Sequence, residues 1–209
     1  MTITGGTGST TRGRERRQRL LDATAELVAA RGFHSVGIAE IGAAAGVTGS
    51  AIYRHFDNKQ EMLAAVFDRV LDDLLRGARA AVDHAPDADP GADTVLVELV
   101  RAHIAFALRN RPVISVYGQE EINLPSDDRR RLRRKQRAYV QVWVDTVATI
   151  RPELEEPQLI AVVSAAIGLL NSVAAFEVRL DDSELGALVG GMALHALRGG
   201  HRWERDSGL

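Results

Sequence analysis

The sequence predicts an all-α protein, with an N-terminal helix-turn-helix head and a larger helical C-terminal domain. Apolar residues recur at helical spacing over most of the chain, and no alternating strand pattern is convincing. The segment HAPDADPGAD, residues 84–93, interrupts this pattern with two prolines and a glycine and is the clearest linker. Charge is uneven, because residues 1–60 hold eight Lys/Arg and five Asp/Glu, whereas residues 61–209 hold eighteen and twenty-three. A small basic head on a larger acidic body would show this asymmetry.

Composition narrows the classes of function. The 209 residues contain no cysteine, which excludes disulfides, thiolate nucleophiles and cysteine-ligated zinc. With 45% apolar and 26% charged residues, the chain is typical of a soluble globular protein. No apolar run approaches the ~20 residues of a membrane helix, and the first residues lack the hydrophobic segment of a signal peptide. We therefore expect a cytoplasmic location and no membrane partner.

Residues 1–13 are predicted to form a flexible basic arm. They include GGTGST, residues 5–10, which we expect to be disordered because it lacks the lysine of a phosphate-binding loop and follows no strand. The first helix is predicted from about Arg14 to Arg31, with Gly32 as its C-terminal stop. The early arginines form either a basic arm or merely a solvated terminus: Arg12, Arg14, Arg16 and Arg17.

Residues 14–60 are predicted to form a helix-turn-helix domain. Two short helices meet at the turn AAGVT, where Ala45 and Gly46 are small enough for a close crossing and Val47 fills the angle between the helices. Thr48 is expected to cap the second helix through its hydroxyl. The apolar side chains that hold the pair together are Ile38, Ile41, Ile52 and Phe56.

The second of these short helices presents small, aromatic and basic residues on its exposed side. Such a mixture suits entry into a DNA groove and contact with phosphates, although a purely structural helical corner is the alternative. The exposed residues are Thr48, Gly49, Ser50, Ala51, Tyr53, Arg54 and His55.

Residues 17–63 resemble the DNA-binding head of the TetR family of transcriptional regulators. The resemblance rests on GF at residues 32–33, I..IG..AGVT at 38–48 and IYRHFDNK at 52–59, in that order. It covers roughly the first third of the chain. Two positions depart from the family pattern, because Gly37 stands where a Ser or Thr normally caps a helix and Gly49 has no side chain for base contact.

The resemblance implies that this protein binds double-stranded DNA, at a palindromic operator, as a homodimer. Thr48, Ser50, Ala51 and Arg54 would face the major groove, and Tyr53, His55 and Lys59 would hold phosphates. The chemistry agrees, because arginine can donate two hydrogen bonds to guanine and a tyrosine hydroxyl or lysine ammonium suits a phosphate oxygen. His55 could instead be a structural histidine.

Residues 61–209 are predicted to be a ligand-binding and dimerisation domain. Helices are expected near residues 58–83, 93–109, 112–122, 126–149, 157–180 and 183–198. Apolar and aromatic faces with a few polar groups are typical of a pocket for a small hydrophobic effector, and equally of an ordinary core. The candidate ligand-binding residues are His103, Phe106, Tyr117, Glu120, Tyr139 and Trp143.

The run RRRLRRKQR, residues 129–137, is interpreted as a solvated face paired with acidic residues. The alternative is a landing site for an anionic head such as the phosphates of an acyl-coenzyme A. Drug-like molecules and acyl-coenzyme A are therefore both possible effectors.

The last two predicted helices are apolar on more than one face and rich in Ala and Gly. One face can pack internally while another meets a partner closely, although a buried central helix in a monomer would look similar. The family resemblance favours a dimer in which two such pairs form a four-helix bundle. The candidate interface residues are Ala161, Ala165, Gly168, Ser172, Ala175, Gly191 and Leu194.

Together these features predict a ligand-responsive transcriptional repressor. No cofactor, metal site or enzyme activity is expected, because the six histidines show no His-x-x-x-His pair and no Ser-His-acid set is recognisable. A helical adaptor or an enzyme without DNA binding is the alternative, but it leaves the exposed face of residues 48–59 unexplained.

Overall fold

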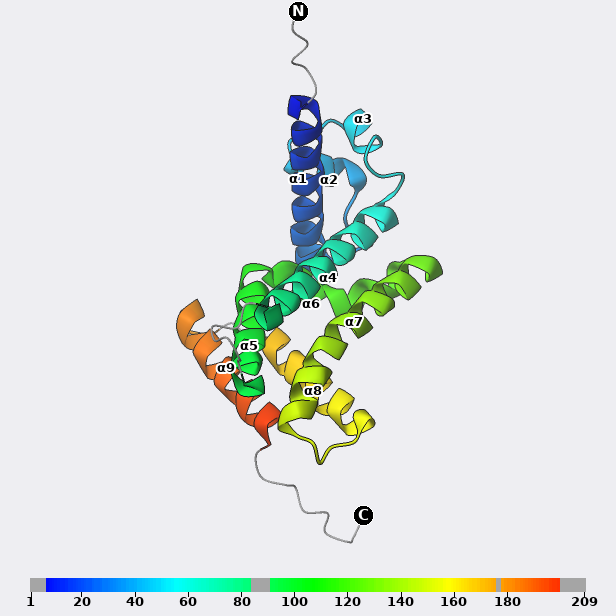
Figure 1. The fold of residues 1–209 in the computed structure, drawn as a ribbon. Helices are drawn as coiled ribbons and strands as arrows, with labels where there is room; N and C mark the ends of the chain where they lie inside the picture. Colours follow the sequence, from blue (N-terminus) through cyan, green and yellow to red (C-terminus); the bar gives the residue numbers. More distant parts are fainter. Residues whose placement is uncertain (1–6, 84–90, 176–177, 200–209) are drawn as a thin grey trace, which may run out of the picture. The chain divides into compact units, whose positions relative to one another are not determined.

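The computed structural model describes residues 7–83, 91–175 and 178–199, and these residues are helical apart from turns and loops (Figure 1). The all-α prediction is therefore confirmed. The helices are α1 (Thr7–Arg31), α2 (Ile38–Ala44), α3 (Gly49–Ile52), α4 (Lys59–Asp83), α5 (Ala92–Arg109), α6 (Arg111–Glu120), α7 (Ser126–Ile150), α8 (Glu156–Asn171) and α9 (Asp182–Arg198), with short 3-10 helices η1 (Glu121–Asn123) and η2 (Ser172–Ala174).

The chain divides into two compact units. The first unit comprises residues 1–70 and 112–133, and the second comprises residues 71–111 and 134–209. The first part of α4 belongs to the first unit and the rest of it to the second, and α7 is divided in the same way. The predicted functional boundaries at residues 13 and 60 stay a prediction, because these units are defined by packing rather than by activity.

Helix α1 begins at Thr7, seven residues before the predicted start. Residues 7–10, predicted to be disordered, are helical, whereas residues 1–6 of the predicted arm lie outside the described part of the chain. The arginines, glutamate and glutamine that follow are good helix formers, which favours this extension. The helix ends as predicted at Gly32, whose φ of 75° is left-handed and whose N–H donates to the Val28 carbonyl at 2.8 Å.

The turn between α2 and α3 depends on two glycines. Gly46 has a φ of 64°, as the sequence predicts for a left-handed residue. Gly42 allows the close crossing, because a Cβ there would lie 2.5 Å from Ile52 Cδ1 and 2.9 Å from the Val47 carbonyl oxygen. Helix α2 ends at Ala44.

The core of the first unit joins these short helices to α1 and α4. Leu20, Ile41 and Ile52 have no exposed surface, and Phe56 is 2% exposed. Burial of these apolar side chains, each of which contributes about 1.5–3 kcal/mol, fixes the position of a four-residue helix that could not be stable alone.

In the second unit, α5 packs against both α8 and α9. Two glycines of α9 permit this close approach: a Cβ at Gly186 would lie 3.2 Å from Ile104, and one at Gly190 would lie 3.3 Å from the same residue. Trp143 and Leu170 are fully buried in the same unit. Helices α5, α8 and α9 therefore all pack against one another.

Helix α8 ends at Asn171 rather than at residue 180 as predicted, and it passes into η2. The Ser172 hydroxyl donates to the Leu169 carbonyl at 2.6 Å and so competes with continuation of the helix. The stretch Glu156–Ala174 spans 19 residues with a mean hydropathy of 1.6, enough to cross a membrane by length and composition alone, and 28% of its most apolar window is buried. The expectation that no apolar run approaches this length is therefore wrong.

Candidate nucleic-acid and effector sites

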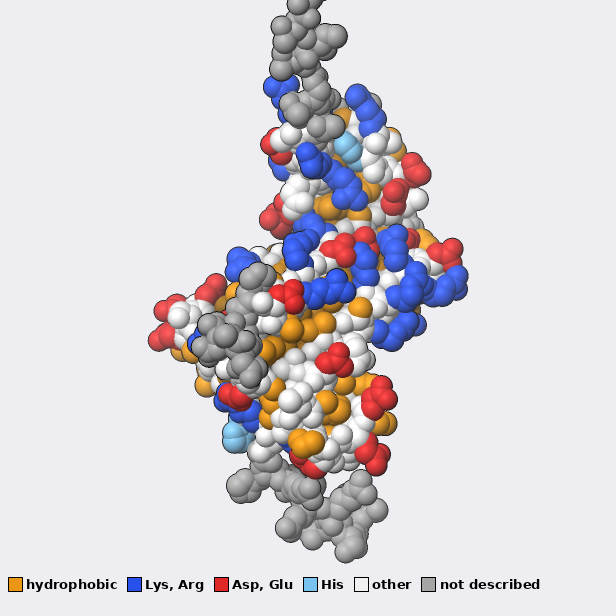
Figure 2. All heavy atoms as spheres, in the orientation of Figure 1, with side chains coloured by type: hydrophobic (Ala, Val, Ile, Leu, Met, Phe, Trp, Pro, Cys, Tyr) orange, Lys and Arg blue, Asp and Glu red, His pale blue; other side chains and the backbone are white. Residues whose placement is uncertain are grey.

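The exposed face of α3 is held by buried side chains on its opposite face. Ile52 has no exposed surface, whereas Tyr53 is 60% exposed and Arg54 is also exposed. Ala51 and His55 are half-buried, and the burial of Gly49 and Ser50 lies outside the described part. Figure 2 shows Lys and Arg side chains over α1 and α3, with acidic side chains among them.

Thr48 lies at the N-cap of α3 and is exposed, but its side chain makes no cap hydrogen bond. The predicted hydroxyl cap is therefore wrong. The backbone carbonyl of Thr48 accepts from the N–H groups of Ala51 and Ile52, at 2.9 and 3.3 Å, and these bonds start the helix.

Lys59 has a structural role that its sequence position does not reveal. Its ammonium donates to the carbonyl oxygens of Phe33 and Val36, at 2.6 and 2.8 Å, and lies 4.2 Å from the Phe33 ring centroid. An ammonium has three N–H donors, so at most one remains for a phosphate. The predicted phosphate contact of Lys59 stays a prediction with this restriction.

Glu40 replaces part of the cap that Gly37 cannot supply. One carboxylate oxygen accepts from the Gly37 N–H at 2.8 Å, and the other accepts from Arg31 at 2.9 Å. The backbone hydrogen bond from Gly37, followed by the Arg31 hydrogen bond, lowers the pKa of the Glu40 carboxyl. This reverse half of a capping box therefore holds the start of α2 although the N-cap residue has no side chain.

Glu120 and Tyr117, both predicted to bind ligand, lie in the first unit. The Glu120 carboxylate accepts from the Phe33 N–H at 3.0 Å and also from the Asn123 side-chain amide. The Tyr117 ring packs edge-on against Phe67 at 4.9 Å between centroids, and burial raises the pKa of its phenol to about 12. Glu120 thus connects α6 to the loop that precedes α2.

Three of the other predicted ligand residues, His103, Tyr139 and Trp143, meet in the second unit together with Asn171, which sequence reasoning missed. His103 Nδ1 lies 2.6 Å from the Tyr139 hydroxyl, and His103 Nε2 lies 3.0 Å from Asn171 Oδ1. Trp143 packs edge-on against both rings, with centroids 6.0 Å from His103 and 6.1 Å from Tyr139. We call these four residues the His103 cluster.

The His103 cluster is uncharged at neutral pH. Burial lowers the pKa of His103 to about 4 and raises the pKa of Tyr139. Because an amide oxygen only accepts, the neutral imidazole carries its proton on Nε2, and Nδ1 accepts from the Tyr139 hydroxyl. The Trp143 indole N–H is buried and has no hydrogen-bond partner among the described residues.

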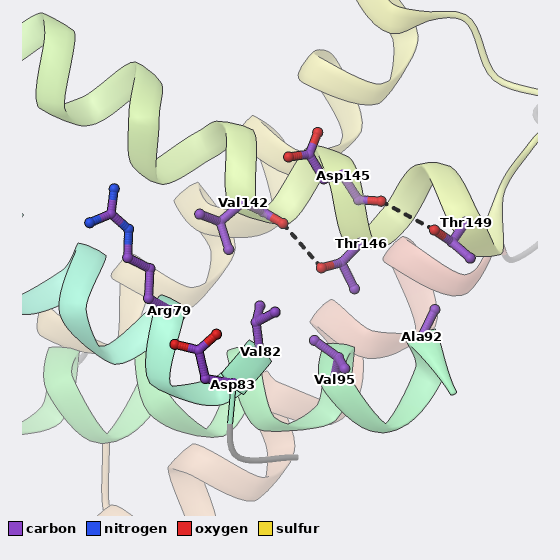
Figure 3. Close-up of a pocket in the computed structure, with 9 residues that line it drawn as sticks. All are labelled: Arg79, Val82, Asp83, Ala92, Val95, Val142, Asp145, Thr146 and Thr149. Atoms are coloured by element: carbon purple, nitrogen blue, oxygen red, sulfur yellow. Dashed lines mark hydrogen bonds between the residues drawn. The ribbon is translucent and has the colours of Figure 1, made fainter. Parts of the chain in front are cut away.

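Two cavities of the second unit are lined jointly by residues of α4, α5 and α7. The smaller, of about 170 Å³, is bordered by His103, Phe106 and Tyr139, with Leu74, Gly77 and Leu99 among its other lining residues. The larger, of about 480 Å³, is lined by residues of α4, α5 and α7 (Figure 3). Its hydroxyls are already used, because Thr146 donates to the Val142 carbonyl and Thr149 to the Asp145 carbonyl.

Comparison with protein families identifies the chain. Residues 20–66 match the description "Bacterial regulatory proteins, tetR family", and residues 88–175 match "Tetracyclin repressor-like, C-terminal domain". The chain belongs to the TetR family. This family is one of bacterial regulatory proteins.

Relatives of this TetR-family chain include both an activator and a repressor. It is 41% identical over 73 residues to the transcriptional activator FasR of Mycolicibacterium smegmatis, covering 35% of this chain and 33% of the relative. It is 29% identical over 114 residues to the transcriptional repressor KstR2 of Rhodococcus jostii, covering 54% of each. The chain thus spans a third to a half of the lengths of these relatives.

The fold of this TetR-family chain is shared with a solved structure of AibR in complex with isovaleryl coenzyme A and operator DNA. The TM-score is 0.69 at 21% identity, with 85% of this chain and 97% of that chain covered. At this identity the likeness shows a common fold.

The TetR-family chain leaves an apolar surface on α8 and α9 uncovered. Ile160, Leu188 and Met192 are 42%, 56% and 53% exposed. Among the predicted interface residues, Ser172 and Leu194 are half-buried and the rest are exposed: Ala161, Ala165, Gly168, Ala175 and Gly191. A Cβ at Gly168 or Gly191 would meet nothing within 4 Å in the single chain.

The basic run at the start of α7 is largely paired. Arg131 forms salt bridges with Asp68 and Asp128, at 3.4 and 3.1 Å, and Arg133 pairs with Glu121 at 3.0 Å. These pairs agree with the interpretation of the run as a solvated face.

Proposed function

We propose that this protein is a ligand-responsive transcriptional repressor of the cytoplasm, which binds a palindromic operator as a homodimer. The observation that carries the proposal is the surface at the two ends of α3, where Thr48 before the helix and Tyr53 and Arg54 after it are exposed while Ile52 is fully buried. A short helix that is anchored by a buried side chain and followed directly by exposed aromatic and basic residues suits insertion into a major groove.

The residues of this face would make two kinds of DNA contact, to bases and to phosphates. Arg54 would read a guanine through two hydrogen bonds, and the Ala51 methyl would touch a thymine methyl. Thr48 and Ser50 would also face bases, while Tyr53, His55 and the remaining N–H of Lys59 would hold phosphates. Base contacts give sequence preference, and phosphate contacts give register and affinity.

The uncovered apolar face of α8 and α9 supports dimerisation. Exposed Leu188 and Met192 lie on α9, and exposed Ala161 and Ala165 lie on α8. Large apolar side chains beside small ones let two helix pairs pack closely as a four-helix bundle. A twofold dimer would present two copies of α3 to successive major grooves, roughly 34–36 Å apart on B-DNA.

The effector would act by population shift. A small, largely hydrophobic molecule bound in the second unit would favour a dimer conformation whose recognition helices have the wrong spacing for the operator. Only the difference in the ligand's affinity for the two conformations can release DNA. The structure of AibR in complex with isovaleryl coenzyme A and operator DNA is an example of this fold with both a small molecule and DNA bound.

Selection of DNA from a random library tests the proposal directly. The full-length protein should enrich a palindromic sequence, and Arg54→Ala should weaken binding to that sequence by about 1–3 kcal/mol with little effect on random DNA. Transcription in vitro from a promoter overlapping the site should fall when the protein is added. Lack of any enriched sequence would refute DNA reading by α3, and a rise in transcription would indicate an activator.

A further inference from the structure

We propose that the effector is an uncharged molecule, mainly apolar, whose polar group is a hydroxyl that donates to the Tyr139 oxygen in the smaller cavity. This inference rests on the proposed function, because it specifies the chemistry of the effector that the second unit would bind.

The volume and lining of the cavity limit the ligand to a small, mainly apolar molecule. Its volume is about 170 Å³, and an apolar cavity of about 150 Å³ is known to accommodate benzene. Leu74, Ala78 and Leu99, which line it, are almost fully buried. A single ring with one short substituent therefore fills the space without forcing the helices apart.

The buried polar groups at the cavity are uncharged and mutually satisfied. His103 is 2% exposed, and both of its ring nitrogens are hydrogen-bonded within the cluster. An ionised ligand group placed beside these neutral groups would lose its hydration without meeting an opposite charge among them, which disfavours it. Arg109, which also lines the cavity, is exposed to solvent rather than buried with the cluster. The two charged lining residues, Asp73 and Arg109, have opposite signs, and Asp73 already pairs with Arg76 at 2.8 Å.

Tyr139 provides a buried, uncharged hydrogen-bonding group for a neutral ligand. Its proton is donated to His103 Nδ1, so its oxygen retains capacity to accept a further hydrogen bond. Tyr139 also lines the cavity, and it is only 4% exposed. A ligand hydroxyl is the smallest uncharged group that can donate to this oxygen.

Four probes of similar size test the inference: benzyl alcohol, toluene, benzoate and benzylamine. The protein carries two tryptophans, Trp143 and Trp203, so Trp203→Phe leaves Trp143 as the sole indole reporter. Titration of this full-length protein at pH 7, followed through the indole N–H resonance, should give benzyl alcohol a dissociation constant at least about tenfold lower than those of the two charged probes. Toluene should bind more weakly than benzyl alcohol, and Tyr139→Phe should remove the difference between them.

The Gly77→Leu variant tests whether the probe binds in this cavity, because it should fill the cavity without unfolding the protein. Gly77 lines the cavity, a Cβ there meets nothing within 4 Å, and leucine is a better helix former than glycine. The variant should remain folded and lose binding of benzyl alcohol. Gly118→Leu, at an exposed position of α6 where a Cβ is equally free, should bind the probe normally.

DNA binding measured on the same preparations distinguishes the two proposals. Protein that selects an operator but binds benzoate or benzylamine as tightly as benzyl alcohol overturns the inference and leaves the proposed function intact. An unchanged Trp143 resonance at saturating benzyl alcohol overturns it in the same way. Normal probe selectivity without any DNA selection would contradict the proposed function alone.

Discussion

At the scale of single residues, buried polar groups determine how this protein responds to its surroundings. His103 is the clearest example, because it is almost completely buried and both ring nitrogens have partners. Its pKa is about 4, below the ordinary value of 6.5, because burial disfavours the imidazolium. The folded protein therefore keeps this ring neutral at pH values where the unfolded chain protonates it.

This difference predicts a loss of stability in acid. Between pH 6.5 and about 4 the unfolded state binds a proton that the folded state does not, so the free energy of unfolding should fall as the pH falls. The contribution of His103 between pH 7 and pH 5 is about 2 kcal/mol. Urea unfolding at both pH values should show a smaller change for His103→Gln than for the parent. An equal change would assign the acid sensitivity to other groups.

Lys59 leads to a second prediction at this scale. Its two hydrogen bonds to the carbonyls of Phe33 and Val36 fix the loop between α1 and α2. Lys59→Met keeps the apolar stem and removes the donors, so it should lower the free energy of unfolding by about 1–3 kcal/mol. The exposed Arg54→Met serves as the control and should be close to neutral. Equal stability of the two variants would leave Lys59 with a phosphate role alone.

At the scale of elements, the sequence predicts the helices well where periodicity is local. Gly32 ends α1 as expected, and the turn after α2 has its left-handed Gly46. Contacts between distant residues were not predictable in this way. The partners of Lys59 lie 26 and 23 residues earlier, and Phe33 and Glu120 are 87 residues apart. Spacing within one helix carries no information about such pairs.

In the candidate sites too, features that depend on local spacing were predictable and contacts between distant residues were not. Exposure of Tyr53 and Arg54 follows from the helical spacing of Ile52 and Phe56, which are buried. Asn171 was missed as a partner of His103, because an asparagine near the end of an apolar helix has no spacing that connects it to α5. The sequence also grouped Glu120 with residues of the His103 cluster, although Glu120 lies in the first unit and the cluster in the second. The apolar helix faces of both units have the same spacing, so only packing separates them.

Gly42 provides a prediction about the α2–α3 element. A methyl group there would contact Ile52 Cδ1 and the Val47 carbonyl at impossibly short distances, so Gly42→Ala should separate the two helices. The expected loss of stability is about 1–3 kcal/mol, together with loss of DNA binding. Thermal unfolding and DNA binding should both be measured. Gly13→Ala, where a Cβ meets nothing within 4 Å, is the matched control and should change neither by a comparable amount.

At the scale of the whole molecule, the uncovered faces of α8 and α9 predict the oligomeric state. Gly168→Arg introduces a charged side chain where the single chain leaves open space, so the monomer should still fold. The variant should elute as a helical monomer in size-exclusion chromatography with light scattering and should lose operator binding, because one half-site offers half the contacts. Gln141→Arg, an exposed position of α7, should remain dimeric. A dimeric Gly168→Arg would place the interface elsewhere.

The division of the chain into two interrupted units has a consequence for synthesis on the ribosome. The first unit needs residues 112–133, and Glu120 in that segment accepts the Phe33 N–H. Residues 71–111, which belong to the second unit, leave the ribosome before that segment. Their unit is complete only when residues 134–209 have followed. Folding in simple N-terminal order, the common pattern for multidomain chains, would therefore leave the first unit incomplete until residue 133 has been made. A nascent chain stalled after residue 70 would expose the apolar side chains of α1 and α4 and become a substrate for chaperones.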